Sequence, residues 1–271
     1  MIMIKMFFYI ILLAISTHAH ASSFDNGLWD SLLKKHVASI RQGQATQVNY
    51  GGFIRDRAQL KTYLAAMSAV PRATFDKWGK PEQLAFLINA YNAWTVELVL
   101  TRYPEIESIK DLGSLLQSAW GKRFIPLLGE TRSLDNIEHE LIRAENRYQE
   151  PRIHFAVNCA SIGCPALRPE AYTGARLTAQ LDDATQLFLS DRSRNWLKGD
   201  TLNLSSIFKW YREDFERGWG GFRELSQFLI AYRKPLGLLD SDVQRLKTNA
   251  LDIEFTEYDW RLNRMPLIAS F

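Results

Sequence analysis

The sequence predicts a single α+β domain in which a long buried helix and several amphipathic helices pack against a small mixed sheet with hairpins. Two patterns predict this class: long segments with apolar residues at helical spacing, and short β-branched segments separated by tight turns. Of the 271 residues, 46% are hydrophobic and eight are Trp, so the chain can bury a large core. No internal repeat or long linker divides the sequence.

Residues 1–21 have the pattern of a secretory signal peptide. Lys5 precedes an apolar run of about ten residues, and Ala19-His20-Ala21 forms a small-residue cleavage site. The mature domain is therefore expected to span residues 22–271 and to be secreted or periplasmic. No later stretch reaches the ~18 consecutive apolar residues of a membrane-spanning helix, so we expect a soluble protein without a membrane span.

The charge balance argues against nucleic acid as a partner. The chain has 33 Lys and Arg against 30 Asp and Glu, a net charge of +3, and the leader contributes one of the Lys. A nucleic-acid-binding surface requires a concentration of basic side chains, and this sequence shows none.

The N-terminal half is predicted to be mainly helical. Amphipathic helices are expected over residues 26–39 and 57–69, with a short strand or turn at residues 48–52 between them. The longest helix is expected over residues 81–103, where apolar residues occupy the whole circumference and predict burial.

Two amides in this buried helix are candidate site residues. Asn89 and Asn92 lie three positions apart and therefore share a face of the helix. A buried amide needs hydrogen-bond partners, so each either satisfies nearby backbone groups or contacts a substrate or a catalytic group.

A hairpin at residues 123–134 is predicted to precede a helix that Ser133 caps. On that helix Glu138 falls in the middle of the apolar face, and His139 lies at its edge. A carboxylate in such a position requires a partner. Glu138 is therefore either an internal salt-bridge partner or a site residue.

The segment from Arg152 to Pro169 contains both cysteines of the chain. Its apolar part, Ile153 to Val157, predicts a buried strand that begins near His154. A loop of small and polar residues follows, and it includes Asn158, Cys159, Ser161 and Cys164. Small residues leave backbone amides uncovered, which suits a nucleophile that faces an oxyanion site.

The C-terminal half predicts further helices and a hairpin. The expected elements are a helix that opens at Thr173, a hairpin at 196–204, helices at 205–215, 222–232 and 240–249, and a strand at 251–255.

Four sequence blocks resemble the family called domain of unknown function 547. They are A-F-L-I-N-A-Y-N-A-W at 85–94, S-L-D-N-I-E-H-E-L-I-R at 133–143, H-F-A-V-N-C-A-S-I-G-C-P at 154–165 and S-S-I-F-K-W-Y-R-E-D-F at 205–215. V-N-Y at 48–50 and Y-D-W-R-L-N at 258–263 fit more loosely. The resemblance covers nearly the whole mature chain. It implies that the blocks around Asn89, Glu138 and Cys159 lie together in one cleft.

The first functional hypothesis is a cysteine-dependent hydrolase or acyl transferase. Cys159 would be the nucleophile, His139 the base, Glu138 the orienting group, and His154 a further candidate. His139 is preferred as base because His154 and Cys159 are five positions apart and point to opposite faces of an ideal strand. The amides of Asn89, Asn92 and Asn158 and the hydroxyl of Ser161 are candidate substrate contacts. No cofactor is expected, and the ligand would be a small molecule or a peptide.

Two alternatives remain open. An exported compartment favours a Cys159–Cys164 disulfide, which would make the chain a binding or assembly protein with a stapled loop. Exposed aromatic residues would then bind glycan or peptide. The two cysteines with His139 and His154 could instead form a Cys₂His₂ metal site, although these histidines lack the spacing of a zinc finger. No metal-site motif occurs, and no metal ligands are assigned.

The mature protein is predicted to begin at Ser22, because cleavage follows the small-residue site at Ala19 to Ala21. Intact-mass measurement of protein recovered from outside the cytoplasm checks this. Recovered material that still contains residues 1–21 would contradict the prediction.

Overall fold

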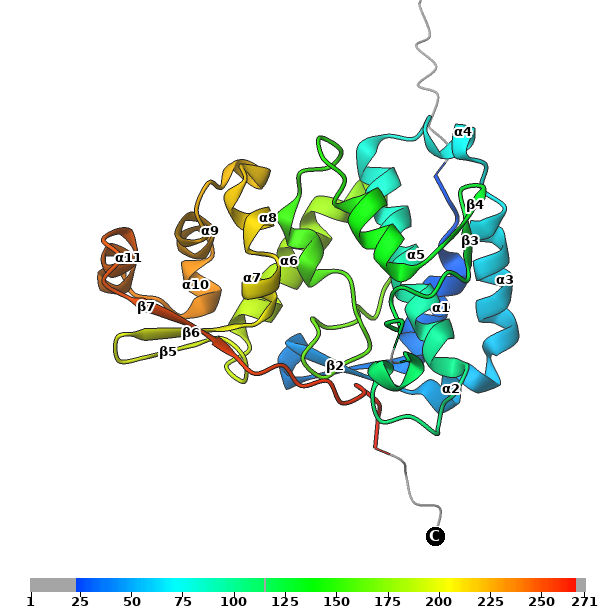
Figure 1. The fold of residues 1–271 in the computed structure, drawn as a ribbon, viewed down its shortest axis with the longest axis horizontal. Helices are drawn as coiled ribbons and strands as arrows, with labels where there is room; N and C mark the ends of the chain where they lie inside the picture. Colours follow the sequence, from blue (N-terminus) through cyan, green and yellow to red (C-terminus); the bar gives the residue numbers. More distant parts are fainter. Residues whose placement is uncertain (1–22, 115, 267–271) are drawn as a thin grey trace, which may run out of the picture.

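The computed structural model describes residues 23–114 and 116–266, and Figure 1 shows their arrangement. Helices dominate, and three small sheets accompany them, so the predicted α+β class is confirmed. The predicted leader lies outside the described residues. Within these residues, no helix combines the length and the apolar character needed to cross a membrane.

The first half of the chain forms five helices, of which α5 is buried at the centre of the other four. They are α1 (Gly27–His36), α2 (Tyr50–Arg55), α3 (Arg57–Ser68), α4 (Arg72–Phe75) and α5 (Lys80–Leu100). Helix α5 confirms the predicted buried helix, since 17 of its 21 residues are buried. Pro81 in its first turn suits a position where the backbone N–H has no helical partner.

The second half adds shorter helices. They are α6 (Leu177–Ser190), α7 (Ile207–Trp210), α8 (Arg212–Glu216), α9 (Leu225–Ala231), α10 (Arg233–Leu236) and α11 (Asp240–Lys247). Short 3₁₀ segments are η1 (Arg41–Gly43), η2 (Ile109–Leu112), η4 (Pro151–Phe155), η5 (Gly174–Arg176) and η6 (Trp219–Gly221). The segment η3 (Asn136–Ile142) is a π-helix.

The strands pair mostly as local hairpins. β1 (Val37–Ile40) pairs with β2 (Ala45–Val48), and β3 (Ile125–Leu127) pairs with β4 (Glu130–Arg132), both antiparallel. β5 (Trp196–Lys198) and β6 (Thr201–Ser205) form the third hairpin, and β7 (Asp252–Thr256) joins β6 in parallel. The predicted hairpins at 123–134 and 196–204 are confirmed, as is the strand near 251–255.

The predicted first helix was too long. Helix α1 ends at His36, and the next four residues form β1 of the β1–β2 hairpin. Gly43, at φ +90°, supplies the left-handed backbone that the connecting turn requires.

The predicted strand at Ile153 to Val157 is wrong, because residues 151–155 form the 3₁₀ helix η4. The Glu150 carboxylate accepts the Arg152 N–H at 3.1 Å, and Pro151 opens the segment, which are features of a helix start. A five-residue apolar run indicates burial but does not by itself distinguish strand from helix.

Buried side chains form two clusters that meet at η4. The first cluster surrounds α5, and the second lies among α6, α7 to α11 and the β5–β6–β7 sheet. Ile153 belongs to the first cluster and Phe155 to the second. The segment η4 is therefore the structural joint between the two halves of the domain.

The chain returns to the first cluster after β7. Figure 1 shows this segment, coloured orange to red, as it runs from the sheet along one side of the molecule to its other end. The Asn263 N–H donates to the Ala160 carbonyl at 2.9 Å, and the Tyr50 hydroxyl donates to Asn263 Oδ1 at 2.7 Å. These contacts fix residues 258–264 beside the cysteine loop.

We predict that Asn92→Leu destabilises the fold by about 1–3 kcal/mol, since it strands two buried backbone groups. The Asn92 amide donates to the Ala156 carbonyl at 2.9 Å and accepts from the Asn158 N–H at 2.8 Å. Urea denaturation measures the free energy of unfolding. Lys61→Leu, on an exposed face of α3, is the control and should be near neutral. An equal effect of both substitutions would refute the prediction.

Candidate functional site

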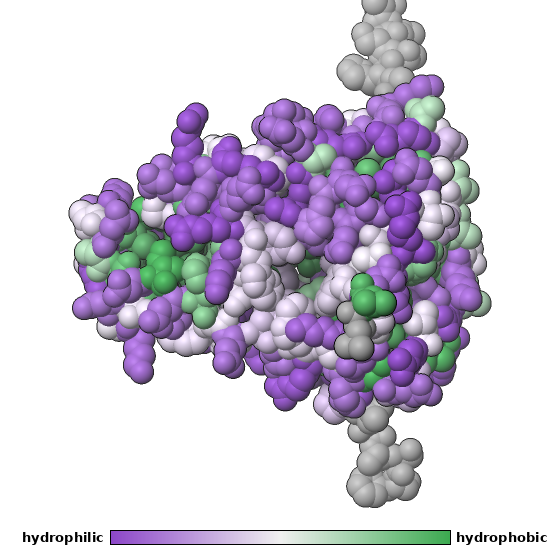
Figure 2. Space-filling view, in the orientation of Figure 1, coloured by the Kyte–Doolittle hydropathy of each residue, from purple (hydrophilic) through white to green (hydrophobic). Residues whose placement is uncertain are grey.

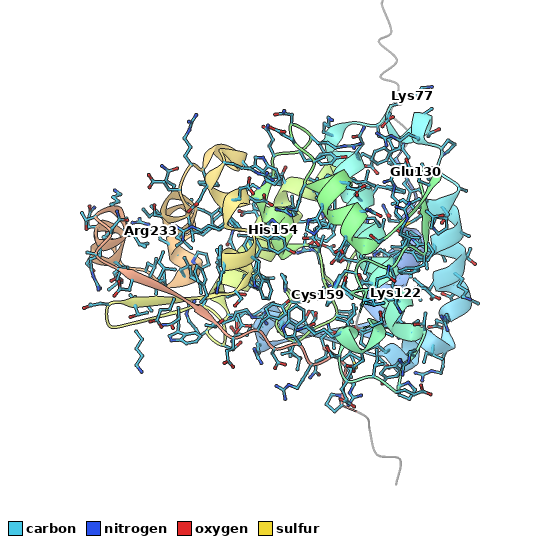
Figure 3. All side chains as sticks on the ribbon, in the orientation of Figure 1. Lys77, Lys122, Glu130, His154, Cys159 and Arg233 are labelled. Carbon is cyan, nitrogen blue, oxygen red and sulfur yellow. A yellow bond between two sulfur atoms is a disulfide. The ribbon has the colours of Figure 1, made fainter. Side chains whose placement is uncertain are left out.

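A cavity of about 170 Å³ lies where the two buried clusters meet. Figure 2 shows that this face of the molecule is hollowed near its centre, and Figure 3 labels His154 and Cys159 close to that place. We call this cavity the aromatic pocket. It is lined by Tyr91, Trp120, Asp135, Glu138, His139, His154, Val157, Cys159, Pro165, Ile207, Trp210, Tyr211, Tyr258 and Trp260.

The lining contains all four residues predicted to be catalytic: Glu138, His139, His154 and Cys159. They come from η3, from η4 and from the loop that follows η4. The segments that the sequence analysis placed in one cleft therefore line one cavity. The contacts of each side chain decide what the group can do.

Glu138 projects from the π-helix η3. Ser133 begins this element as predicted, since its hydroxyl accepts the Asn136 N–H at 3.1 Å. The Arg143 N–H reaches the Glu138 carbonyl at 2.8 Å, which is the wide spacing of a π-helix and is frequent at functional sites. Glu138 is only 4% exposed, and its Oε1 has no hydrogen-bond partner among the described residues. A buried carboxylate oxygen without a partner is costly and needs an explanation.

His139 is not placed to act as a general base. The Arg143 guanidinium lies 2.6 Å from His139 Nδ1. An arginine can only donate, so Nδ1 is the acceptor and the proton of neutral His139 is on Nε2. That Nε2 lies 4.0 Å from an Asp135 carboxylate oxygen. The lone pair that a base would use is therefore already engaged, and the role predicted for His139 is not supported by this geometry.

His154 is buried and bonds to a carboxylate that the sequence did not reveal. Its Nε2 lies 2.7 Å from Asp214 Oδ2, and its ring stacks on Tyr211 with centroids 4.0 Å apart. Burial lowers the pKa of His154 below its usual range, so the neutral form is favoured. A charged ring would in addition bury an Nδ1–H without a partner, since Nδ1 makes no hydrogen bond among the described residues.

Asp214 is the centre of a buried network. Arg143 donates to its two oxygens at 2.5 and 3.1 Å, and Arg217 lies 2.5 Å from Oδ1. Burial alone would raise the pKa of Asp214, but the hydrogen bonds from His154 and Arg143 lower it to about 2. The carboxylate therefore stays ionised across the physiological range.

Cys159 and Cys164 form a disulfide in the structure, with their Cα atoms 6.0 Å apart. The expectation of a free Cys159 thiol is corrected by this bond, because a disulfide sulfur provides no thiolate. The Cys159 N–H points to Cys164 Sγ at 2.9 Å, and the Tyr258 hydroxyl lies 3.2 Å from each sulfur. The predicted loop of exposed amides is thus a stapled turn.

Three predicted substrate contacts are structural amides. Asn89 exchanges two hydrogen bonds with the Tyr172 backbone, at 2.7 and 3.0 Å. Asn92 bridges the backbone of Ala156 and Asn158, and the Asn158 amide donates to the Pro165 carbonyl at 2.7 Å. None of these amides lines the aromatic pocket.

The fourth predicted substrate contact, Ser161, is buried at 1% exposure in the turn that pairs with Leu262. It does not line the aromatic pocket either. The three amides therefore hold backbone segments in place, and the Ser161 hydroxyl lies 3.8 Å from the Cys159 sulfur.

The aromatic wall of the pocket was missed by sequence reasoning. Trp210 stacks on Trp260 at 5.6 Å, Tyr258 lies 4.5 Å from Trp260, and Trp120 meets Trp260 edge-on at 5.7 Å. A signal was present, because Trp210, Asp214, Tyr258 and Trp260 all fall within the two C-terminal blocks at 205–215 and 258–263.

The Cys₂His₂ metal alternative is not assembled. Both sulfurs are bonded to each other, and His154 is bonded to Asp214. Over residues 23–114 and 116–266, no three His, Cys, Asp or Glu side chains are grouped as metal ligands would be.

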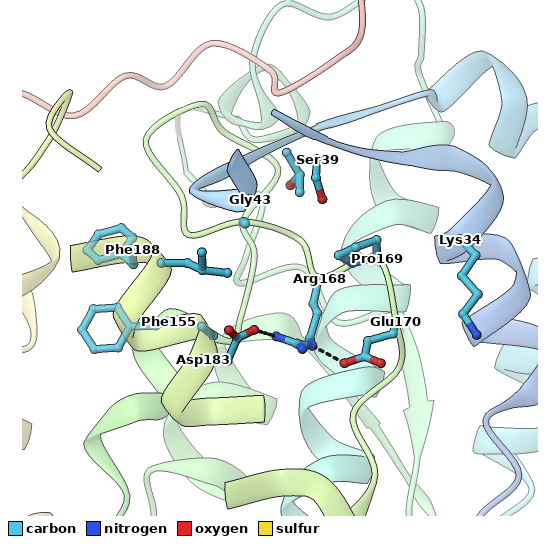
Figure 4. Close-up of a pocket in the computed structure, with 13 residues that line it drawn as sticks. Lys34, Ser39, Gly43, Phe155, Arg168, Pro169, Glu170, Asp183 and Phe188 are labelled. Carbon is cyan, nitrogen blue, oxygen red and sulfur yellow. Dashed lines mark hydrogen bonds and ion pairs between the residues drawn. The ribbon is translucent and has the colours of Figure 1, made fainter. Parts of the chain in front are cut away.

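A larger cavity, of about 320 Å³, lies between the β1–β2 hairpin and α6 (Figure 4). Phe155, Leu187 and Phe188 contribute apolar surface to it. Its charged residues neutralise one another, since Arg168 donates to Glu170 and to Asp183, each at 2.6 Å. The aromatic pocket is the stronger candidate site despite its smaller volume, because it alone of the two contains a buried carboxylate without a cationic partner.

Residues 75–189 match the model of a family described as "Protein of unknown function, DUF547". The resemblance drawn from the sequence blocks is confirmed over this segment, which includes Glu138, His154 and Cys159. The opposite wall of the pocket, from Trp210 to Trp260, lies beyond it. No curated protein and no solved structure matches the chain.

The lowered pKa of His154 predicts a loss of stability in mild acid. Unfolded His has a pKa of about 6.5, so stability that depends on neutral His154 is fully present above that pH and is lost as pH falls through the lower folded pKa. His154→Gln keeps a donor for Asp214 but does not titrate in this range. Between pH 7 and pH 5 the wild type should therefore lose more stability than this variant.

Urea denaturation at several pH values measures this difference, and the other histidines cancel because both proteins contain them. Equal losses in the two proteins would show that His154 keeps an ordinary pKa. The contribution of Asp214 to stability is lost in a separate, more acidic pH range, since unfolded Asp titrates near pH ~3.9 and the folded group near pH 2.

Proposed function

We propose that this chain, whose residues 75–189 belong to the DUF547 family, is an exported protein that binds a small ligand in the aromatic pocket. The observation that carries the proposal is the Glu138 carboxylate, buried without a hydrogen bond to Oε1 in a cavity walled by aromatic rings. Ligand sites typically combine an apolar, aromatic lining with a few convergent polar groups.

The disulfide supports a binding role over thiol chemistry. In the bonded state Cys159 has no nucleophilic thiolate, and neither His139 nor His154 makes a hydrogen bond to its sulfur among the described residues. The bond instead holds the turn against Tyr258, one of the wall residues.

Export is supported by the leader pattern and by the disulfide together. A short apolar run with a small-residue cleavage site precedes the domain, and disulfides persist in oxidising compartments. Both features support the proposal that the mature protein lies outside the cytoplasm.

The size of the pocket restricts the ligand. A cavity of about 170 Å³ accommodates one ring or one side chain and not a whole oligomer. The ligand is accordingly a small molecule, a terminal sugar or the end of a peptide.

A cysteine-dependent hydrolase or acyl transferase is the second candidate. Cys159 lines the pocket and is partly exposed, whereas Cys164 is 3% exposed. After reduction, Cys159 would face the pocket together with His154, whose Nδ1 carries no proton in the neutral ring. His154 thus replaces His139 as the base in this hypothesis.

The binding proposal is tested by thermal unfolding of the mature chain with glucose, N-acetylglucosamine, free amino acids and dipeptides. A ligand at one hundred times its Kd stabilises the folded state by about 2.7 kcal/mol. At least one probe should raise Tm, and Trp210→Ala should abolish the shift. Trp210 is 47% exposed, so its removal should leave the fold intact. Leu239→Ala, at an exposed position, is the control and should respond like the wild type.

Iodoacetamide labelling separates the two candidates. Protein purified without reductant should contain no reactive thiol. Labelling of Cys159 under these conditions, with esterase activity on p-nitrophenyl acetate that Cys159→Ser removes, would replace the binding proposal with the thiol one.

A further inference from the structure

The aromatic pocket is lined by two carboxylic side chains and, in the part of the chain that the structure describes, by no lysine or arginine. The two are Glu138 and Asp135, and burial favours the neutral form of His154 beside them. Burial raises the pKa of Asp135, the neighbouring His139 opposes this rise, and Glu138 adds to it. The two carboxylates therefore act on the same small space.

No arginine inside the domain neutralises Glu138 by a direct contact. Arg143 lies nearest in the network, but Nε and Nη2 donate to Asp214, and Nη1 donates to His139. All three of its nitrogens are thus engaged elsewhere. Among the described residues the Glu138 side chain forms no ion pair, and its Oε1 accepts no hydrogen bond.

The phenols that line the pocket remain neutral. Burial raises the pKa of Tyr91, Tyr211 and Tyr258, and the proximity of Glu138 raises each of them further. For Tyr211 a side-chain hydrogen bond with Glu138 adds to the rise, so Oε1 is the atom of Glu138 that is left for a ligand. None of these groups adds negative charge, and each can donate a hydrogen bond or present a ring to a ligand.

The aromatic wall is continuous. Trp210, Tyr258 and Trp260 contact one another with ring centroids 4.5–5.6 Å apart, and Trp120 extends the wall. A cation is attracted to the face of such rings, most strongly to Trp. One ammonium group already uses the wall, because Lys110 Nζ lies 3.7 Å from the Trp260 ring centroid.

We propose that the aromatic pocket recognises an organic ammonium group that still carries N–H, such as a primary amine or the ammonium of an amino acid. The cation faces the aromatic wall, and its N–H groups donate to the Glu138 carboxylate. This inference rests on the proposed binding function and specifies the chemistry of the ligand. The Glu138 oxygen Oε1, which is buried and accepts no hydrogen bond among the described residues, explains the requirement for a donor, since such an atom is costly to bury until it is hydrogen-bonded.

The test titrates the mature protein with n-butylammonium, 1-butanol and tetramethylammonium, with tryptophan fluorescence and calorimetry as readouts. The alcohol has nearly the same shape without the charge, and tetramethylammonium has the charge without N–H. We expect n-butylammonium to bind at least about tenfold more tightly than either of the others, in keeping with cation–π attraction joined to a charge-assisted hydrogen bond.

Three variants assign the effect to the pocket. Glu138→Gln should weaken n-butylammonium at least about tenfold, because it removes the charge but preserves the shape, and it should leave 1-butanol unchanged. Trp210→Leu, at a half-exposed position, should weaken n-butylammonium even if the buried Glu138 variant does not fold. Glu257→Gln removes an exposed carboxylate one residue before Tyr258 and is the matched control, with affinity expected to be unchanged.

The outcomes separate this inference from the binding function. Equal affinity for amine and alcohol, or tighter binding of tetramethylammonium, overturns the ammonium inference and leaves the binding proposal intact. Binding of a sugar without binding of any amine likewise overturns the ammonium inference and leaves the binding proposal intact. If no sugar, amino acid, amine or alcohol binds the wild type, both proposals fail.

Discussion

The ionised carboxylate of Asp214 is the interaction on which the assembly of the two halves depends. Its side chain is fully buried, yet it is surrounded by Arg143, Arg217 and His154 at hydrogen-bonding distance. These partners come from η3, α8 and η4, so one charge connects three elements and both buried clusters. Removal of a single partner from a buried ion network is costly because the remaining charge is left without compensation. The network therefore fixes η4 against α8, and with it the position of the pocket wall.

The same region contains a second buried carboxylate, Glu138, which has fewer hydrogen-bond partners than Asp214. Asp214 accepts hydrogen bonds from Arg143 and His154 and pairs with Arg217, whereas Oε1 of Glu138 in η3 accepts none among the described residues. This contrast supports the proposal that Glu138 is available to a ligand in the pocket. A carboxylate with a purely structural role would be expected to have hydrogen-bond and ion-pair partners within the protein, as Asp214 has. The disulfide, residues 258–264 and the aromatic rings define the shape of the pocket around Glu138. For this reason we propose that the site binds a cationic group.

The features that could be predicted from the sequence are those that a local pattern of residues determines. Helix α5, the β3–β4 and β5–β6 hairpins and the buried position of Glu138 all follow from spacing and turn residues. The predictions from the sequence were wrong where contacts between distant segments determine the backbone conformation or the partners of a side chain. The run Ile153 to Val157 became a 3₁₀ helix because it is packed between two clusters and has no strand to pair with. The engagement of His139 by Arg143 and the pairing of His154 with Asp214, 60 positions away, depend on folding and leave no local trace. The aromatic wall likewise joins residues that are distant in sequence.

The segment that follows β7 completes the wall of the pocket, so the pocket forms late in the synthesis of the chain. Tyr258 and Trp260 form part of its wall, and Asn263 is bonded to the cysteine turn and to Tyr50. During synthesis these two residues leave the ribosome after every other residue that lines the pocket. The nascent chain can therefore bury much of its first cluster early and still have an open, unfinished pocket. Under the proposed binding function, ligand recognition would begin only after residues 258–263 have been synthesised, so a partly synthesised chain would not yet hold its ligand.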